Sequence, residues 1–215
     1  MPTAGRWVAA AAPGAWLPFD FWQDRLSANP IEDIMLRLGW WGFVFLVASL
    51  AVTPLRRLTG WNRIIRYRRF LSLWAFAYLT SHFLTYLVLD QFFGWEFIIE
   101  DIVERPFILS GFAAWLLLIP LAATSTKGWI RRLGKRWTRL HRLVYLSAVL
   151  GLLHFYWKVK ADTREPLVFA LIVLVLFTLR VPMVRKFVEE KRRAWHHRRR
   201  EGTGLRASRK NTADP

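Results

Sequence analysis

The sequence predicts an all-α membrane protein, a polytopic helix bundle with five or six transmembrane helices. Long apolar runs alternate along the chain with short clusters of charge, a pattern typical of helical membrane proteins. The 215 residues are 54% hydrophobic although the net charge is +17, a combination rare in soluble domains. The 13 Trp and 16 Phe supply the aromatic residues that gather at membrane interfaces.

The strong basic charge alone would also suit a nucleic-acid-binding protein. Here the Lys and Arg residues lie in short clusters between apolar runs and are not spread over amphipathic surfaces. We therefore expect a lipid membrane as the partner of these charges, and no nucleic acid. The chain has no Cys, which excludes disulfides, iron–sulfur clusters and thiolate zinc sites.

Six segments are candidate spans, and each should be a helix because backbone groups in lipid must satisfy their own hydrogen bonds. The first, 7–22, is short and broken by prolines, so it is weak and the total is five or six. The other five are apolar over nearly their whole length: 39–55, 70–89, 107–123, 140–157 and 166–184. Pro106 suits a first helical turn, Pro120 predicts a kink, and Arg180 lies near a span end where it can snorkel.

These spans divide the chain into three parts. Residues 1–26 form an N-terminal segment that carries the weak first span. Residues 27–184 form the transmembrane domain, with the five stronger spans. Residues 185–215 form a basic tail, which we expect to be cytoplasmic and partly disordered.

Charge alternates from one loop to the next. Two loops and the tail are basic, and the loops contain Arg56, Arg57, Arg63, Arg66, Arg68, Arg69, Lys127, Arg131, Arg132, Lys135, Arg136 and Arg139. The intervening segments are acidic or mixed and contain Asp20, Asp24, Glu32, Asp33, Asp90, Glu96, Glu100, Asp101, Glu104, Asp162 and Glu165. By the positive-inside rule the basic loops and the C-terminus face the cytoplasm.

Three of the five histidines lie in or at the ends of spans, where an ionisable side chain is a functional candidate by default. Spans 70–89 and 140–157 run in the same direction, and His82 and His154 should differ by only about 3 Å in height. His141 should lie roughly 20 Å nearer the cytoplasm than His154. On one ideal helix, 13 residues turn through about 220° beyond three full turns, so His141 and His154 would face different sides unless the helix is distorted.

Three kinds of ligand fit histidines at such depths to different degrees. Haem takes axial His ligands and fits between the helices of a bundle. Zinc would need more ligands close together, and a proton relay would need carboxylates inside the spans, which contain none. A small transporter or proton channel, and a passive membrane anchor for a partner enzyme, remain as alternatives to haem-based electron transfer.

Several stretches resemble the MsrQ family, which lies within the wider group of ferric reductase-like membrane domains. They are SANPIED (27–33), LAVTPLRRLTG (50–60), LWAFAYLTSHFLTYLVLD (73–90) and the long run from 100 to 162 that begins EDIVERPFILSGF. The resemblance covers about residues 27–180. It implies that 27–184 is a ferric reductase-like haem-binding domain.

The resemblance also implies a function and its partners. A family member takes electrons on the cytoplasmic side from flavin (FMN) and a flavin reductase. It passes them through haem b to MsrP, a periplasmic molybdopterin enzyme that reduces methionine sulfoxide in envelope proteins. The chain would then be an electron-transfer subunit with no substrate chemistry of its own.

The family's membrane histidines correspond to His82, His141 and His154. The resemblance implies that His82 and His154 ligate a haem in the periplasmic half, and that His141 ligates a second haem, or one face of it, near the cytoplasm. Larger oxidase relatives have two histidines on the earlier helix, whereas this chain has His82 and, fourteen residues before it, Arg68. Arg68 would cap a haem propionate or lie opposite His141. Four polar residues are candidates for hydrogen bonds around the site: Thr80, Ser81, Thr85 and Tyr86.

Overall fold

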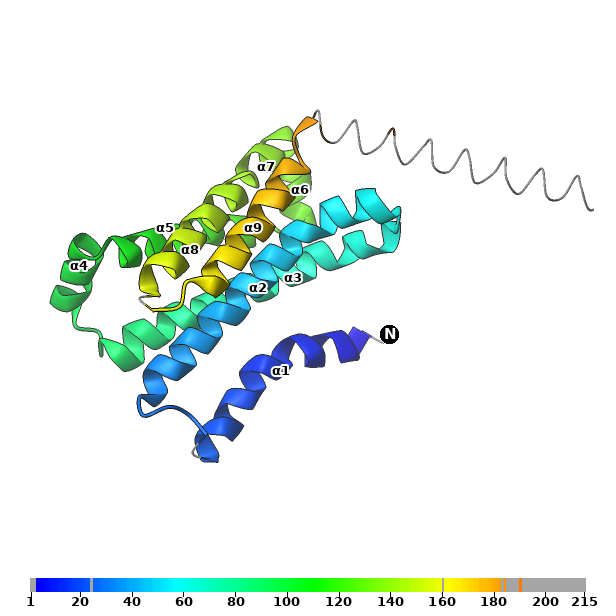
Figure 1. Cartoon of the computed structure of the whole chain (residues 1–215). Coiled ribbons are helices and arrows are strands. Elements are labelled where there is room, and N and C mark those ends of the chain that lie inside the picture. Colours follow the sequence, from blue (N-terminus) through cyan, green and yellow to red (C-terminus); the bar gives the residue numbers. More distant parts are fainter. Residues whose placement is uncertain (1–2, 24, 160, 183, 185–189, 191–215) are drawn as a thin grey trace, which may run out of the picture.

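The computed structural model describes residues 3–23, 25–159, 161–182, 184 and 190, and all regular structure in this part of the chain is helical (Figure 1). The long helices are α1 (Thr3–Trp22), α2 (Pro30–Thr59), α3 (Ile65–Leu84), α5 (Pro106–Ala123), α8 (Leu143–Lys158) and α9 (Arg164–Thr178). The short ones are the 3₁₀ helix η1 (Asn62–Ile64), the π-helix η2 (Thr85–Asp90), α4 (Trp95–Glu104), α6 (Lys127–Leu133) and α7 (Lys135–Leu140). The predicted all-α membrane bundle is confirmed.

Each of the six predicted spans overlaps one of the six long helices, although the span 70–89 continues into η2 and the span 166–184 extends beyond the end of α9. Three helical stretches are long and apolar enough to cross a membrane by themselves, namely Pro30–Thr59, Asn62–Asp90 and Pro106–Ala123. The helices α8 and α9 have 16 and 15 residues, short of the roughly 20 that a span needs without tilt or flanking turns. The predicted tail 185–215 lies outside the described residues except for Glu190.

Small residues let the helices of the bundle approach closely, as is usual when packing has to compete with lipid. The antiparallel helices α2 and α3 pack along their length, and a Cβ at Gly42 of α2 would meet Leu79 Cγ of α3 at 2.7 Å. The second pair is α5 and α8, where the Ser147 hydroxyl donates to the Ala114 carbonyl at 2.9 Å. Ala75 and Ala148 are fully buried where the pairs meet around the core residues Leu46 and Leu50.

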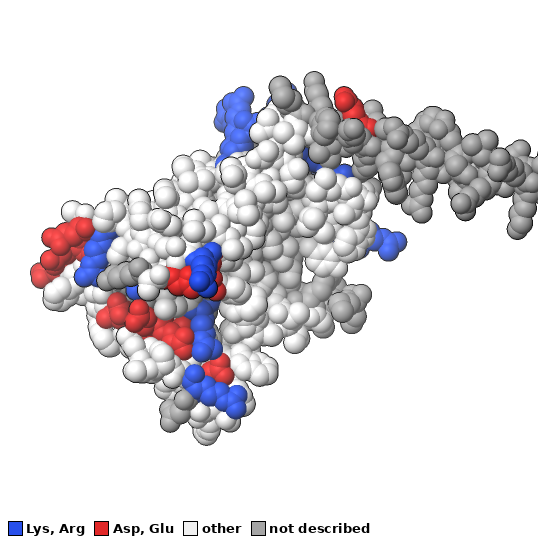
Figure 2. All heavy atoms as spheres, viewed as in Figure 1, with Lys and Arg blue, Asp and Glu red and all other residues white. Residues whose placement is uncertain are grey.

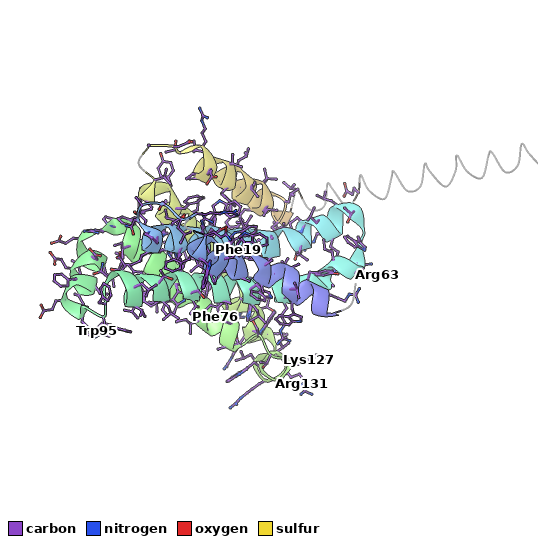
Figure 3. All side chains as sticks on the ribbon, turned by 90° about the horizontal axis from the view of Figure 1, so that it is seen from below. Phe19, Arg63, Phe76, Trp95, Lys127 and Arg131 are labelled. Atoms are coloured by element: carbon purple, nitrogen blue, oxygen red, sulfur yellow. The ribbon has the colours of Figure 1, made fainter. Side chains whose placement is uncertain are left out.

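The charges lie at two ends of the molecule. Figure 2 shows a broad middle surface without Lys, Arg, Asp or Glu, and acidic residues gathered around α4 and the start of α2. Trp95 on α4 lies at one end of the bundle, and Arg63, Lys127 and Arg131 lie toward the other (Figure 3). Exposed Leu167, Leu171 and Leu174 on α9 suit a lipid-facing surface. The acidic segments and the basic loops are thus separated by the apolar middle.

The helix expected over 140–157 begins later than predicted. His141 and Arg142 form a turn between α7 and α8, and His141 has φ −70° and ψ −3°, away from the helical value of ψ. The His141 ring stacks on Trp137 with centroids 3.8 Å apart, which favours this turn. The assumption of one ideal helix from His141 to His154 is therefore wrong, and so is the 220° offset derived from it.

Tyr78 ties α1 to the bundle through an unusual hydrogen bond. In a regular helix the Gly14 N–H would donate to the Ala10 carbonyl. Here Gly14 donates to the Tyr78 hydroxyl at 2.9 Å, and that hydroxyl donates to Ala10 O at 2.9 Å. A side-chain hydroxyl from α3 is thus inserted into the ladder of α1, a recognised cause of helix bending. The Arg37–Asp20 ion pair, 2.8 Å, is a second link.

The substitution Tyr78→Phe should loosen α1 and leave the rest of the bundle in place. It removes a buried hydroxyl worth about 1 kcal/mol per hydrogen bond. Amide hydrogen exchange in residues 3–22, measured by mass spectrometry in detergent, should accelerate several-fold, up to roughly tenfold. Tyr156→Phe, at a side chain that is 44% exposed, is the matched control and should change nothing. Equal exchange in the two variants would show that the hydroxyl does not hold α1.

Candidate functional site

A cavity of about 540 Å³ lies between α2, α3, α5 and α8, on the acidic side of the bundle. Most of its wall is aromatic or aliphatic, and this part includes Phe43, Leu46, Leu79, Phe83, Phe107, Phe112, Trp115, Leu118 and Phe155. His82 from α3 and His154 from α8 both line it. An apolar cavity of this size with a few polar groups has the character of a small-molecule or cofactor site.

The structure brings His82 and His154 together. Their ring centroids are 6.0 Å apart and the ring planes make an angle of 78°. His82 Nδ1 lies 2.8 Å from the Met35 carbonyl oxygen of α2, and His154 Nδ1 lies 2.7 Å from the Phe107 carbonyl oxygen of α5. A carbonyl only accepts, so each Nδ1 carries the proton. Each Nε2 is then left with a lone pair, which is the form that ligates a metal.

Two glycines make room for these imidazoles. A Cβ at Gly39 of α2 would lie 2.9 Å from His82 Nδ1, and a Cβ at Gly111 of α5 would lie 2.5 Å from His154 Nδ1. Each ring therefore lies against bare backbone one turn from the carbonyl that it contacts. The sequence pairs Met35 with Gly39 and Phe107 with Gly111, the same i, i+4 spacing on two different helices.

His141 lies elsewhere, in the turn before α8, and is not part of the cavity wall. Its Nδ1 is 3.1 Å from the Trp137 carbonyl oxygen, and its Nε2 is buried without a hydrogen-bond partner. Arg68 is within electrostatic range of His141. The structure thus places Arg68 and His141 in one region near the basic end, away from His82 and His154.

Sequence reasoning missed a set of charges at the cavity rim. Arg37, Arg105 and Lys158 line the cavity, and each is paired with a carboxylate. Arg37 Nε lies 3.0 Å from Asp33, Arg105 Nε 3.1 Å from Asp101, and Lys158 Nζ 3.2 Å from Glu32. The sequence did contain a sign of this cluster: Arg37, Arg105 and Lys158 are basic residues next to segments that are otherwise mostly acidic. Partly exposed pairs like these add little stability, so their place at the rim is the more informative feature.

The four polar candidates near His82 have different surroundings. Tyr86 alone of the four lines the cavity, and its hydroxyl donates to Asp101 Oδ2 at 2.9 Å. Thr80 accepts from Trp115 Nε1 at 3.1 Å, and Thr85 donates to the Ser81 carbonyl. The π-helix η2 begins at Thr85, three residues after His82. Such segments are frequent at functional sites because the wider turn redirects the side chains that follow it.

The profile of the family described as "Ferric reductase like transmembrane component" matches residues 38–152. This region starts within α2 and ends within α8, so it includes His82 and the two glycines and stops two residues before His154. The fold and the family match therefore define a membrane protein of the ferric reductase-like class. No solved structure matches the chain.

Relatives give a narrower assignment. A protein of Rhodospirillum rubrum is 54% identical over 181 residues, which cover 83% of this chain and 87% of that protein. Proteins of Xanthomonas euvesicatoria and Caulobacter vibrioides are 51% and 46% identical, and the matches cover 81% of this chain and 83% and 84% of those proteins. All three are named "Protein-methionine-sulfoxide reductase heme-binding subunit MsrQ". The chain belongs to the MsrQ family, as the sequence motifs predicted.

The substitution Gly111→Ala should destabilise the protein because the new Cβ collides with the His154 ring. Overpacking of this kind costs about 1–3 kcal/mol. The apparent melting temperature in detergent should fall clearly. Gly128→Ala is the control, since a Cβ there meets nothing closer than Thr126 Oγ1 at 3.9 Å. A Gly111→Ala protein as stable as the Gly128→Ala protein would mean that the contact between ring and backbone is not a constraint.

Proposed function

We propose that this chain is a haem b-carrying electron-transfer subunit of the bacterial inner membrane. In this proposal it takes electrons from FMN and a flavin reductase on the cytoplasmic side. It delivers them to an MsrP-like periplasmic molybdopterin enzyme that reduces methionine sulfoxide. The observation that carries the proposal is the pair His82 and His154, two Nδ1-protonated imidazoles in one apolar cavity with their centroids 6.0 Å apart.

The cavity residues fit a haem. Imidazole nitrogens bind metals at about 2 Å, and the 6.0 Å between the His82 and His154 ring centroids would leave room for one metal ion held by both Nε2 atoms. The apolar aromatic wall suits a flat macrocycle, and the rim cations Arg37, Arg105 and Lys158 suit its two carboxylates. Within the described residues no group of three or more His, Asp or Glu could hold a metal ion. A haem iron would need only two ligand atoms from the protein, which is consistent with the histidine pair.

When bound, haem iron would supply one-electron transfer at a potential set by its axial ligands and surroundings. The chain's own part is to hold both Nε2 atoms in place. The carbonyls of Met35 and Phe107 fix the tautomer and orientation of the two rings. The apolar wall excludes water, and the rim pairs keep charge at the mouth of the cavity. The chemistry on methionine sulfoxide would belong to the partner enzyme.

His141 and Arg68 are proposed to hold a second haem, or one face of it, nearer the cytoplasm. The distance of these two residues from the His82–His154 cavity supports two haem positions at different depths in the membrane. Along α8 alone, the helix rises by about 17 Å from Leu143, next to His141, to His154. The Nε2 of His141 is buried and makes no hydrogen bond of normal geometry, although the Leu121 backbone is close, so it is the candidate ligand atom. The basic residues of the 56–69 and 127–142 segments also place positive charge where a phosphate-bearing flavin would approach.

The orientation follows from charge. The basic loops and the tail that begins at 185 are assigned to the cytoplasm, and the cavity rim with its acidic neighbours to the periplasm. An MsrP-like partner would then approach the end of the bundle that carries α4 and the start of α2. In this orientation the cavity would lie on the side of the membrane where the electron-accepting partner binds.

The substitution His154→Ala should remove most of the haem held in the cavity. The purified protein should lose at least half of its haem, measured as the pyridine complex, together with the corresponding reduced absorbance band. His82→Ala should do the same, because each variant removes one of two ligands. His196→Ala, the same change in the tail, is the control. An unchanged haem-to-protein ratio and spectrum in His154→Ala would refute the assignment, and a colourless parent protein would favour a transporter or an anchor.

The substitution Arg105→Gln should lower the midpoint potential of the cavity haem, because it removes a cation and leaves the Asp101 charge uncompensated at the rim. The expected change is roughly some tens of millivolts, where 59 mV is tenfold for a one-electron couple. A redox titration followed by absorbance measures it. Arg164→Gln, at an arginine side chain that is 92% exposed, is the control. Equal potentials in both variants would remove Arg105 from the site.

A further inference from the structure

One face of α4 forms part of the cavity wall. Asp101 and Ile102 line the cavity, and Ile98 and Asp101 are only 5% and 8% exposed. Asp101 also connects the wall to the rim, because it accepts from the Tyr86 hydroxyl and pairs with Arg105. A helix with its side chains is about 10–12 Å across. The outer side of α4 is therefore roughly one helix diameter from the cavity.

The outer side of α4 carries two rows of side chains. Residues four apart lie on the same side of a helix. The apolar ridge consists of Trp95, Ile99 and Val103, which are 61%, 61% and 74% exposed. The acidic ridge, one residue further along in each turn, consists of the exposed residues Glu96, Glu100 and Glu104. The two ridges thus run next to each other along one helix.

An exposed aromatic turn precedes α4. Phe92 and Phe93 have φ angles of 45° and 59°, in the left-handed region that bulky residues rarely adopt. Their side chains are 76% and 51% exposed, so burial within the chain does not offset this strain. Strained backbone is often found at functional sites. The turn adds two exposed aromatic side chains to the end of the bundle where α4 lies (Figure 1).

The acidic ridge has no partner within the part of the chain that the structure describes. There, no ion pair or hydrogen bond involves the three glutamate side chains. Like charges four residues apart destabilise a helix. Other carboxylates at this end are paired with cations of the chain: Asp20 and Asp33 with Arg37, Glu32 with Lys158, and Asp101 with Arg105. The glutamates of the acidic ridge are therefore available to cations of another molecule.

The outer side of α4 suits a protein partner better than a lipid surface. Amphipathic helices that bind lipid surfaces are rich in Lys and Arg on their polar face, whereas Trp95–Glu104 contains neither. Protein interfaces combine aromatic and aliphatic anchors with a polar rim. On α4 the apolar ridge supplies the anchors and the acidic ridge supplies the rim. A complementary partner surface has basic residues beside an apolar patch.

We propose that the outer side of α4, together with the turn at Phe92 and Phe93, is the docking surface for the electron-accepting partner. The partner is a soluble protein whose apolar patch is bordered by Lys or Arg. The apolar ridge makes the central contacts, and the acidic ridge steers association. A partner docked there is separated from the cavity by the width of α4. The inference rests on the proposed function for the direction of electron flow, whereas docking itself does not require haem.

Binding of a purified MsrP-like protein to the chain in phosphatidylcholine nanodiscs tests this surface. Trp95→Ala should raise the Kd about 10- to 100-fold, the range of an interface hot spot. A triple variant, Glu96→Gln with Glu100→Gln and Glu104→Gln, should slow association about tenfold at low salt, and less at high salt because exposed charges are screened. Asp162→Asn, at a carboxylate side chain that is 69% exposed, is the control and should change neither quantity.

A second measurement identifies what covers the apolar ridge. The chain has no Cys, so Ile99→Cys introduces a unique thiol. In nanodiscs a membrane-impermeant maleimide should modify this thiol, and partner at about ten times its Kd should slow the reaction about tenfold. Leu171→Cys, on the lipid-facing surface of α9, should stay unmodified with and without partner. Asp162→Cys should react at the same rate in both conditions.

The outcomes separate this inference from the proposed function. If the parent binds the MsrP-like protein and both ridge variants bind it equally well, the docking surface is wrong and the proposed function stands. A thiol at position 99 that the maleimide never reaches would show that lipid covers the ridge, which also overturns the docking surface. Absence of binding by the parent would overturn the docking surface and the proposed partner together. Haem content, measured in parallel, should be equal in all variants, so a colourless parent with Trp95-dependent binding would refute only the conduit.

Discussion

The contact of two imidazole rings with bare helix backbone is the constraint on which the bundle depends. His82 can reach the Met35 carbonyl only because Gly39 has no side chain, and His154 can reach the Phe107 carbonyl only because of Gly111. Each contact joins one helix pair, α2 with α3 and α5 with α8. The small residues Ala75 and Ala148 let the two pairs meet in the core.

The charged and polar side chains at the two ends of the molecule differ in whether they have partners. At the acidic end every cation named at the cavity rim has a carboxylate neighbour, and Asp90 and Glu165 also line the cavity. At the basic end Arg180 and His141 each keep a buried nitrogen without a partner.

The long helices and the similar depth of His82 and His154 could be predicted from the sequence. The first follow from the length of the apolar segments, and the second follows from the rise of about 1.5 Å per helical residue. It did not predict the turn at His141, the helix α4 or the rim cations. The turn depends on Trp137 stacking, and the rim depends on which distant carboxylate each cation meets, for example Lys158 with Glu32 across 126 residues. The roles of Gly39 and Gly111 were visible only once the rings had been placed against them.

The Tyr78 hydroxyl has a consequence for biogenesis. The ladder of α1 is completed by a residue 64 positions later in the chain than Gly14. At 5–20 residues per second, the ribosome reaches Tyr78 about 3 to 13 s after Gly14. During that interval α1 has neither its partner helix nor the bridging hydroxyl. The helix α1 is therefore synthesised before the residue that completes its hydrogen bonding, and it reaches its final structure only after α3 has been made.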